Sequence, residues 1–439
     1  MSWFLPSLAL LIATPPPGGP GAGPTLDTGA TPPALVAPPS ADTPTPAPSN
    51  IPAVTVGLEV LLNDPARLEA LKGKRLGVLT HPAAVDSRWV PSVDRLVAAG
   101  KKAGFKVVQL YGPEHGIRGW MSANEKTGAA IDPHTGLPVE NLFGLGKKGR
   151  PSARSLERID ILVVDLQDLG SRTYTYISTL GEAMIAAGMA KKKVMVLDRP
   201  NPYGGLVFEG PVLRKKRRGF IGWASLPVTH GMTIGEVARY YLKFEDVVCD
   251  LEVVPMKGWR RDLDWRETGL FWVPTSPGIP HIENAWLYAA TGMVGGISDN
   301  VSEGVGTTLP FEQVGAEWAE AVPLEKALTA LNLPGVRFRA TTFRPNWFDY
   351  KGKVLHGVQL VIVDVAAFRP IKTALGIWTS LEALWPGQAT LRKNHAAVWG
   401  NETILAMVKA GKNVAQIERT WQRDLERFAE RRAQVLIYP

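Results

Sequence analysis

Short runs of β-branched and aliphatic residues alternate with segments of helical periodicity between residues 75 and 197, and this alternation most limits what the chain can fold into. The apolar runs lie at 75–79, 106–110, 159–164 and 193–197, and the helix-like segments lie at 91–103 and 174–191. Strands that alternate with helices form parallel sheets that are covered on both faces. The pattern therefore predicts an α/β, Rossmann-like N-terminal domain.

Polar side chains follow each predicted strand at the point where it ends. The segments are THP (80–82), GPEHG (112–116), DLQD (165–168) and DRPNP (198–202). Open α/β sheets bind their ligands in the crevice outside the carboxyl ends of the strands. We therefore expect these four segments to form a binding site.

No glycine-rich phosphate-binding motif accompanies the strands. Neither GxGxxG nor GxxxxGK[ST] occurs at a strand-to-helix turn, and the glycine-rich stretch at 142–149 lacks the Walker spacing. The single cysteine, Cys249, excludes a disulfide framework and a thiolate metal cluster, and no HExxH or comparable pair of ligands occurs. We expect no cofactor and no metal.

The second half of the chain predicts a smaller α+β domain. Thr233 and Glu236 form a capping-box pattern that opens a helix through about residue 244, so His230 lies in a loop ahead of a helix. A glycine-rich loop at 300–308 leaves the carboxylate of Glu303 prominent. Residues 354–365 look like a strand, and one face of a C-terminal helix is marked by Val414, Ile417, Trp421, Leu425 and Phe428. We expect a catalytic domain at 53–282 and an auxiliary domain at 283–439.

The N-terminal segment indicates export. Residues 1–14 form an apolar run that is too short to span a membrane and resembles the core of a signal peptide. Residues 15–52 form a proline-rich linker, with twelve prolines and no Lys or Arg between residues 15 and 50. Beyond this run no stretch is long and apolar enough to be an integral membrane segment. We expect a periplasmic or extracellular protein.

The net charge of +8 favours polyanionic surroundings, such as cell-envelope polymers, membranes or nucleic acid. The one dense basic run, residues 214–218, is typical of a solvated loop, with contact to an anionic polymer as the alternative. No aromatic interleaving or known binding module accompanies it, so nucleic-acid binding is set aside. The sequence leaves the oligomeric state open.

Ten sequence blocks carry a resemblance to a known family. They are LTHPAAVD (79–86), YGPEHGIRG (111–119), TGLPVENLFG (135–144), DILVVDLQDLGSRTYTYISTL (160–180), LDRPNPYGG (197–205), EGPVL (209–213), LPVTHGMTIGE (226–236), SPGIP (276–280), SEGVGTTLPFE (302–312) and FRP (368–370). Together they resemble the NamZ-like exo-β-N-acetylmuramidases of bacterial peptidoglycan recycling. The match runs from about Leu76 to the C-terminus.

The resemblance implies a Rossmann-like catalytic domain, a C-terminal auxiliary domain and an active cleft between them. It also implies release of terminal β-1,4-linked N-acetylmuramic acid from the non-reducing ends of peptidoglycan fragments, with Glu114 as the leading catalytic candidate. Two departures from the family pattern stand out. The chain reads THPAAVD at 80–86 where the family usually reads TNPTGVD, and Val305 replaces the arginine of SEGRGT, which removes a contact for an anionic substrate group.

Glycoside hydrolysis needs a carboxylic acid to protonate the departing oxygen and usually a second carboxylate. Glu114 is the predicted acid, and its partner is one of Asp165, Asp168, Asp198 and Glu303. Muramic acid carries a lactyl carboxylate, so its site should contain a guanidinium. Arg118, Arg172 and Arg199 lie just past strand ends, and an ion pair with a neighbouring aspartate is the structural alternative for each.

We predict Glu114, His115, Asp168 and Glu303 as catalytic. The predicted substrate-binding residues are His81, Arg118, Asp165, Gln167, Arg172, Tyr174, Asp198, Arg199, Asn201, His230 and Thr307. For each histidine a plain structural role is the alternative to a functional one. Tyr174 and Tyr176 are two residues apart and cannot share one helix face, so at most one of them is expected to reach the cleft.

Three functions from different classes remain open. The first is the exported exo-glycosidase, acting on muropeptides or disaccharides. The second is a non-catalytic peptidoglycan- or saccharide-binding protein on the same fold. It is favoured if Val305 marks a degraded site, and the retention of Glu114, His115, Asp168 and Glu303 speaks against it. The third is a metallohydrolase that uses His81, His115 and His230, and the lack of a close ligand pair speaks against it.

Overall fold

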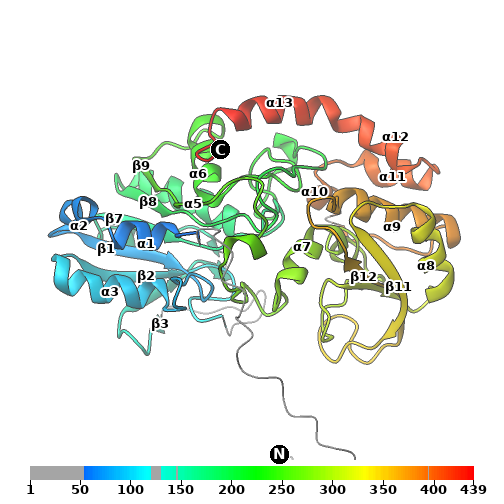
Figure 1. Cartoon of the computed structure of the whole chain (residues 1–439), viewed down its shortest axis with the longest axis horizontal. Helices are drawn as coiled ribbons and strands as arrows, with labels where there is room; N and C mark the ends of the chain where they lie inside the picture. The colour runs from blue at the N-terminus through cyan, green and yellow to red at the C-terminus, as the bar shows by residue number, and fades with distance from the viewer. Residues whose placement is uncertain (1–53, 120–129, 145–146, 394) are drawn as a thin grey trace, which may run out of the picture. The chain divides into compact units, whose positions relative to one another are not determined.

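A computed structural model describes residues 54–119, 130–144, 147–393 and 395–439. The signal-like segment and the proline-rich linker expected at 1–14 and 15–52 lie outside the described residues. The largest sheet has the strand order β3-β4-β2-β1-β7-β8-β9, and every neighbouring pair is parallel except β3 with β4 (Figure 1). Its strands are β1 (Arg75–Thr80), β2 (Lys106–Gly112), β3 (Ala130–Ile131), β4 (Pro138–Asn141), β7 (Ile161–Asp165), β8 (Lys193–Leu197) and β9 (Leu251–Val254).

Helices cover both faces of this sheet because its central strands are apolar on both sides. In β7, Ile161 and Val163 belong to one core cluster, whereas Leu162 and Val164 belong to another. Successive side chains of a strand point to opposite faces, so the two clusters mark the two faces. The first cluster packs beneath α1 (Gly57–Leu62), α2 (Pro65–Leu71) and α3 (Ser92–Ala103), and the second packs against α5 (Tyr176–Met189) and α6 (Ile234–Phe244). The predicted Rossmann-like α/β fold is confirmed.

The second half of the chain forms a smaller unit of mixed structure. A three-stranded antiparallel sheet has the order β10-β12-β11, with β10 (Gln313–Ala316), β11 (Val336–Phe343) and β12 (Leu355–Ile362). The helices beside it are α7 (Ile282–Thr291), α8 (Ala321–Ala330) and α9 (Pro370–Leu384). This confirms the smaller α+β domain and the strand expected at 354–365.

The C-terminal helical segment is broken where one continuous helix was expected. It comprises α10 (His395–Trp399), α11 (Thr403–Lys409), α12 (Val414–Glu418) and α13 (Gln422–Ala433), and a short 3₁₀ turn, η4 (Arg419–Trp421), separates the last two. After α13 the chain returns to the parallel sheet, where the Tyr438 hydroxyl donates to Asp198 Oδ2 at 2.5 Å. The C-terminal residues therefore link the smaller unit to the unit that contains the parallel sheet.

The remaining elements are short. They are α4 (Ala153–Leu156), the hairpin β5 (Phe143–Gly144) with β6 (Lys147–Lys148), and the 3₁₀ turns η1 (Lys215–Arg217), η2 (Arg266–Thr268) and η3 (Gly295–Ile297). The capping box predicted for Thr233 and Glu236 is present at the start of α6. Among the described residues, no helix has the length and apolar character needed to cross a membrane.

Candidate active site

A cavity of about 460 Å³ lies where the carboxyl-end loops of the parallel sheet meet loops of the smaller unit. Four of the residues predicted from the sequence line it, namely Glu114, His115, Tyr174 and Glu303. The other lining residues are Thr173, Thr175, Ser276, Pro277, Gly278, Ile279, Tyr288, Val305, Phe311, Trp347 and Phe348. A cavity of this volume fits a small-molecule ligand such as a single sugar.

Glu114 is presented by a tight turn directly after β2. His115 and Gly116 both have positive φ, 68° and 71°, and the Gly116 amide donates to the Pro113 carbonyl at 3.0 Å. The Thr175 hydroxyl donates to Glu114 Oε2 at 2.7 Å. This contact fixes the carboxylate.

Glu303 reaches the cavity from the opposite side, in the loop that leads to β10. Burial raises the pKa of its carboxyl to about 7, and the positive charge of Arg392 offsets part of that rise. The carboxylate packs directly on Gly295 in η3, where a Cβ atom would collide with it. Glu303 therefore keeps its proton close to neutral pH, and its position depends on a glycine that no sequence motif singled out.

Tyr288 of α7 lies among the carboxylates from both sides of the cavity. Its ring centroid is 5.6 Å from that of Tyr174 and 5.1 Å from that of Phe311. Burial raises the pKa of the Tyr288 phenol, a hydrogen bond with Thr173 opposes the rise, and the negative charges of Glu114, Asp168 and Glu303 add to it. The sequence did not identify this residue because a tyrosine in an apolar helix is typical of core packing.

Two predicted residues form a buried pair outside the lining set. The Asp168 carboxylate lies 3.5 Å from His230 Nε2 and also accepts from the Gly170 amide at 2.7 Å. His230 Nδ1 accepts from the Met232 amide at 3.3 Å. The pair braces two loops at the carboxyl ends of the strands.

His81 and Gln167 are also bonded to each other below the cavity. The backbone amide of Gln167 donates to His81 Nε2 at 2.8 Å. Burial holds the pKa of His81 well below its usual value, and the nearby positive charge of Arg199 lowers it further. The Gln167 side-chain amide donates to the carbonyls of Asp168 and Pro200. His81 is therefore a neutral acceptor at physiological pH.

The three predicted anion-binding arginines have other partners. Arg118 forms a two-point ion pair with Asp132, at 2.8 Å for the shorter contact, and Arg199 pairs with Asp165. Arg172 is fully buried and donates to the carbonyls of residues 211, 226 and 398, which ties the two halves of the chain together. In the described lining of the cavity there is no Lys or Arg.

Three further predicted residues hold loops in place. Asp198 accepts from the Thr233 hydroxyl, the Gly235 amide and the Tyr438 hydroxyl, and burial raises the pKa of its carboxyl to about 7. The Asn201 side chain donates to the Met232 carbonyl at 3.0 Å. The Thr307 hydroxyl donates to the Gly304 carbonyl at 2.7 Å and so braces the loop that carries Glu303.

Tyr174 and Tyr176 differ in their relation to the cavity, although their ring centroids are only 4.7 Å apart. Tyr174 lines the cavity, whereas Tyr176 is fully buried and donates to the Thr275 carbonyl at 2.7 Å. The part of the chain that the structure describes contains no group of three or more His, Cys, Asp or Glu side chains arranged to hold a metal ion.

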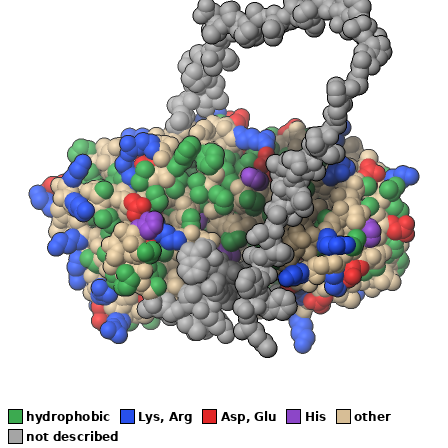
Figure 2. Space-filling model, turned by 90° about the horizontal axis from the view of Figure 1, so that it is seen from below, with side chains coloured by type: hydrophobic (Ala, Val, Ile, Leu, Met, Phe, Trp, Pro, Cys, Tyr) green, Lys and Arg blue, Asp and Glu red, His purple; other side chains and the backbone are tan. Residues whose placement is uncertain are grey.

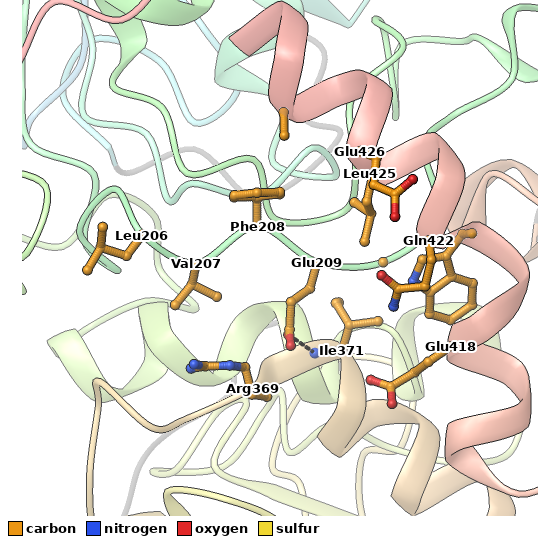
Figure 3. Close-up of a pocket in the computed structure, with 13 residues that line it drawn as sticks. Leu206, Val207, Phe208, Glu209, Arg369, Ile371, Glu418, Gln422, Leu425 and Glu426 are labelled. Carbon is orange, nitrogen blue, oxygen red and sulfur yellow. Dashed lines mark hydrogen bonds between the residues drawn. The ribbon is translucent and has the colours of Figure 1, made fainter. Parts of the chain in front are cut away.

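A second pocket, of about 420 Å³, lies between α13 and the loop 206–210 (Figure 3). Its most buried acidic group is Glu209, whose Oε2 accepts from the Ile371 amide in the first turn of α9 at 3.1 Å. Burial raises the pKa of Glu209 to about 7. This carboxylate, which belongs to the EGPVL block, therefore caps a helix.

The basic run at 214–218 is paired with acidic side chains. Arg217 contacts Glu402 at 2.9 Å, and Arg218 pairs with Glu245. In Figure 2, Lys and Arg side chains lie at several separate places on the face that is visible, which is typical of a mixed surface.

The fold and the cavity define a two-domain α/β protein in which two glutamates face one sugar-sized cavity, an arrangement typical of glycoside hydrolases. The family model for the N-terminal part of the exo-beta-N-acetylmuramidase NamZ matches residues 76–283, and the model for its C-terminal part matches residues 286–438. The chain belongs to this family of glycoside hydrolases.

Individual relatives agree with the family assignment. The chain is 40% identical over 389 residues to the peptidoglycan beta-N-acetylmuramidase NamZ of Bacillus subtilis strain 168, which covers 88% of this chain and 92% of the relative. Two crystal structures of DUF1343 family proteins from Bacteroides fragilis NCTC 9343 have the same fold. One has a TM-score of 0.81 at 36% identity, the other 0.69 at 27%, and each alignment covers 88% of this chain and 99% of the other.

Proposed function

We propose that this protein is an exo-acting β-N-acetylmuramidase that releases terminal β-1,4-linked N-acetylmuramic acid from the non-reducing ends of peptidoglycan fragments. The observation that carries the proposal is the pair Glu114 and Glu303, which face one cavity from two parts of the chain. The Bacillus subtilis relative is named a peptidoglycan beta-N-acetylmuramidase, and the matching family model is described as an exo-beta-N-acetylmuramidase, which supports the choice of substrate.

The surroundings of the two glutamates support different roles for them. Glu303, whose pKa burial raises to about 7, is the group that can give a proton to the glycosidic oxygen as the bond to the anomeric carbon breaks. Glu114, held by Thr175, acts as the carboxylate, either as the nucleophile or as the base that activates water. Water supplies the hydroxyl of the released sugar. The sequence alone favoured Glu114 as the acid, so the experiment must separate the two assignments.

Two substrates separate these roles. A nitrophenyl β-N-acetylmuraminide has a leaving group that departs without help from an acid, whereas the disaccharide of N-acetylmuramic acid and N-acetylglucosamine needs protonation. We expect Glu303→Gln to lose about a thousandfold in kcat/KM on the disaccharide and far less on the nitrophenyl substrate. Glu114→Gln should lose activity on both substrates.

Glu317→Gln, which removes an exposed carboxylate paired with Lys353, is the matched control and should behave as the wild type. The reverse pattern between the two variants would make Glu114 the acid. A folded wild-type protein that hydrolyses neither substrate would contradict the proposal and favour the saccharide-binding alternative.

We also propose that the protein acts outside the cytoplasm. The support is the apolar run at 1–14 followed by the proline-rich segment at 15–52. Fractionation of cells that produce the full chain, with N-terminal sequencing of the product, tests this. Recovery of the intact chain from the cytoplasm alone would contradict export.

A further inference from the structure

A smaller pocket, of about 160 Å³, lies beside two exposed aromatic side chains, Trp89 and Phe271. Both line the pocket, they are 61% and 62% exposed, and their ring centroids are 4.9 Å apart at a tilt of 48°. Large aromatic rings are seldom left this exposed next to each other unless something packs on them. The pair forms an apolar platform at the pocket's edge.

The loop that carries Trp89 is built to hold the ring outward. Trp89 has a φ of 64°, in the left-handed region that bulky residues rarely adopt. The buried carboxylate of Asp86 accepts from the amides of Arg88 and Val90 at 2.9 Å each, and it pairs with Arg95 at 3.0 Å. The turn is therefore fixed at its base, and the strained residue is the one that carries the exposed ring.

Polar groups lie on the inner side of the same pocket. Gln167 is 1% exposed, and both hydrogens of its side-chain amide are donated to backbone carbonyls. Its Oε1 is buried and accepts no hydrogen bond within the described chain. Arg199, also buried, uses Nε and Nη2 for its bonds to Asp165 and to the Val85 carbonyl. The pocket thus combines an aromatic platform with an unused acceptor and a guanidinium.

One loop of the chain lines both this pocket and the active-site cavity. Phe271 belongs to the smaller pocket and Ser276 to the cavity, and five residues of extended chain reach at most about 18 Å. Between them the ring of His81, which accepts from Gln167, lies 4.8 Å from the ring of Tyr176, whose hydroxyl donates to the Thr275 carbonyl.

Backbone strain is concentrated around the same two pockets. Seven non-glycine residues of the described chain have positive φ, and four of them, Trp89, His115, Phe311 and Phe348, line one pocket or the other. Strain of this kind gathers where side chains must be aimed at a ligand.

We propose that the pocket rimmed by Trp89 and Phe271 is a second saccharide subsite, which holds a sugar ring of the glycan beyond the unit bound in the cavity. The rings would stack on the apolar face of the sugar, and Gln167 Oε1 would accept a hydrogen bond from a hydroxyl or an acetamido N–H. The inference rests on the proposed function, because it assumes a glycan that extends from the cavity.

The test compares a short and a long substrate in the full-length protein. Trp89→Ala should lower kcat/KM about tenfold on a tetrasaccharide of two disaccharide repeats, mainly through KM. It should change turnover of the nitrophenyl monosaccharide less than about twofold, because that substrate carries no second sugar ring. Trp89→Tyr should restore most of the loss, since it keeps a flat ring.

Met189→Ala, which removes an exposed side chain from α5, is the control and should leave both substrates unaffected. Equal activity of Trp89→Ala and wild type on the tetrasaccharide would overturn the subsite, as would an equal loss on both substrates. Tetrasaccharide binding by calorimetry in a Glu114→Gln background gives a readout without turnover. The two failures can be told apart. A wild-type protein that is inactive on every substrate refutes the proposed function, whereas tetrasaccharide affinity that is unchanged by Trp89→Ala refutes the subsite alone.

Discussion

The Thr175 hydroxyl donates a hydrogen bond of 2.7 Å to Glu114 Oε2. Thr175 is the residue that precedes α5, and Glu114 follows β2, so the bond joins the ends of two elements at the mouth of the parallel sheet. A glutamate on a tight turn has free side-chain torsions unless something holds it. Thr175 is therefore a positioning residue for Glu114.

Thr175→Val keeps the shape of the side chain and removes the donor. Because the net value of one such bond is about 1 to 2 kcal/mol, we expect kcat/KM on the disaccharide to fall about tenfold. Thr175→Ser retains the hydroxyl and should stay within about threefold of the wild type. If the valine variant equals the wild type, Glu114 does not depend on this bond.

The pH profile should follow Glu303. Its carboxyl has a pKa raised to about 7 by burial, so it keeps its proton below that pH and loses it above. An acid catalyst works only while protonated, and kcat/KM should therefore decline as the pH rises through about 7. In Glu303→Gln, the residual activity on the disaccharide should lack this alkaline limb. A limb that persists in the variant belongs to another group.

Gly295 makes room for the Glu303 carboxylate, and a methyl group there would displace it. We expect Gly295→Ala to lower kcat/KM on the disaccharide at least tenfold. The adjacent Gly296→Ala is a close control, because a Cβ atom at 296 has no neighbour within 4 Å. Thermal unfolding of both variants would show whether a loss of activity is merely a loss of folded protein.

The bond from Tyr438 to Asp198 should stabilise the fold. Tyr438→Phe removes the donor, and we expect the free energy of unfolding to fall by about 1 to 3 kcal/mol. Burial raises the pKa of Asp198 to about 7, so its contribution to stability is greatest below its unfolded value and declines as the pH rises through about 7.

The Tyr438 hydroxyl supports the ionised form of Asp198, so the loss in Tyr438→Phe should be larger at pH 8 than at pH 5. Urea unfolding at both pH values measures it. Tyr350→Phe, which removes a hydroxyl that donates to the Val301 carbonyl, is the control and should lack this pH dependence. An equal loss at both pH values would show that the Asp198 charge is irrelevant.

The elements that the sequence predicted are those with continuous apolar runs. The strand expected at 193–197 is β8 with the same bounds, because a buried parallel strand is apolar on both faces. β11 was missed since its side chains alternate between exposed and half-buried, with Arg337 and Arg339 on the outside. The break between α12 and α13 was missed because one apolar stripe continues across it.

The candidate site could be predicted only where a motif lies in a polar, glycine-containing loop. Glu114 and Glu303 stood out as carboxylates in glycine-containing loops. Tyr288 and Gly295 come to the cavity through the packing of α7 and η3, which no local pattern records. The sequence also did not show that the predicted arginines lie outside the cavity lining, because their partners are set by packing. The Asp132 that pairs with Arg118, like the carbonyls that hold Arg172, is recognisable only in the folded chain.

Val305 offers the sharpest test of substrate choice. It lines the cavity, and the described lining contains no Lys or Arg to meet the lactyl carboxylate of muramic acid. Val305→Arg adds a guanidinium at this point, and a charge-assisted hydrogen bond to a carboxylate contributes about 1.5 to 3 kcal/mol. We expect KM for the nitrophenyl muraminide to fall about tenfold, with no gain on the matching N-acetylglucosamine substrate, which lacks the carboxylate.

Val305→Met adds length without charge and should improve neither substrate. If the arginine variant gains equally on both sugars, the added side chain acts through packing. If it loses activity on both, position 305 faces a part of the sugar other than the lactyl group, and the cavity binds the muramic acid carboxylate elsewhere.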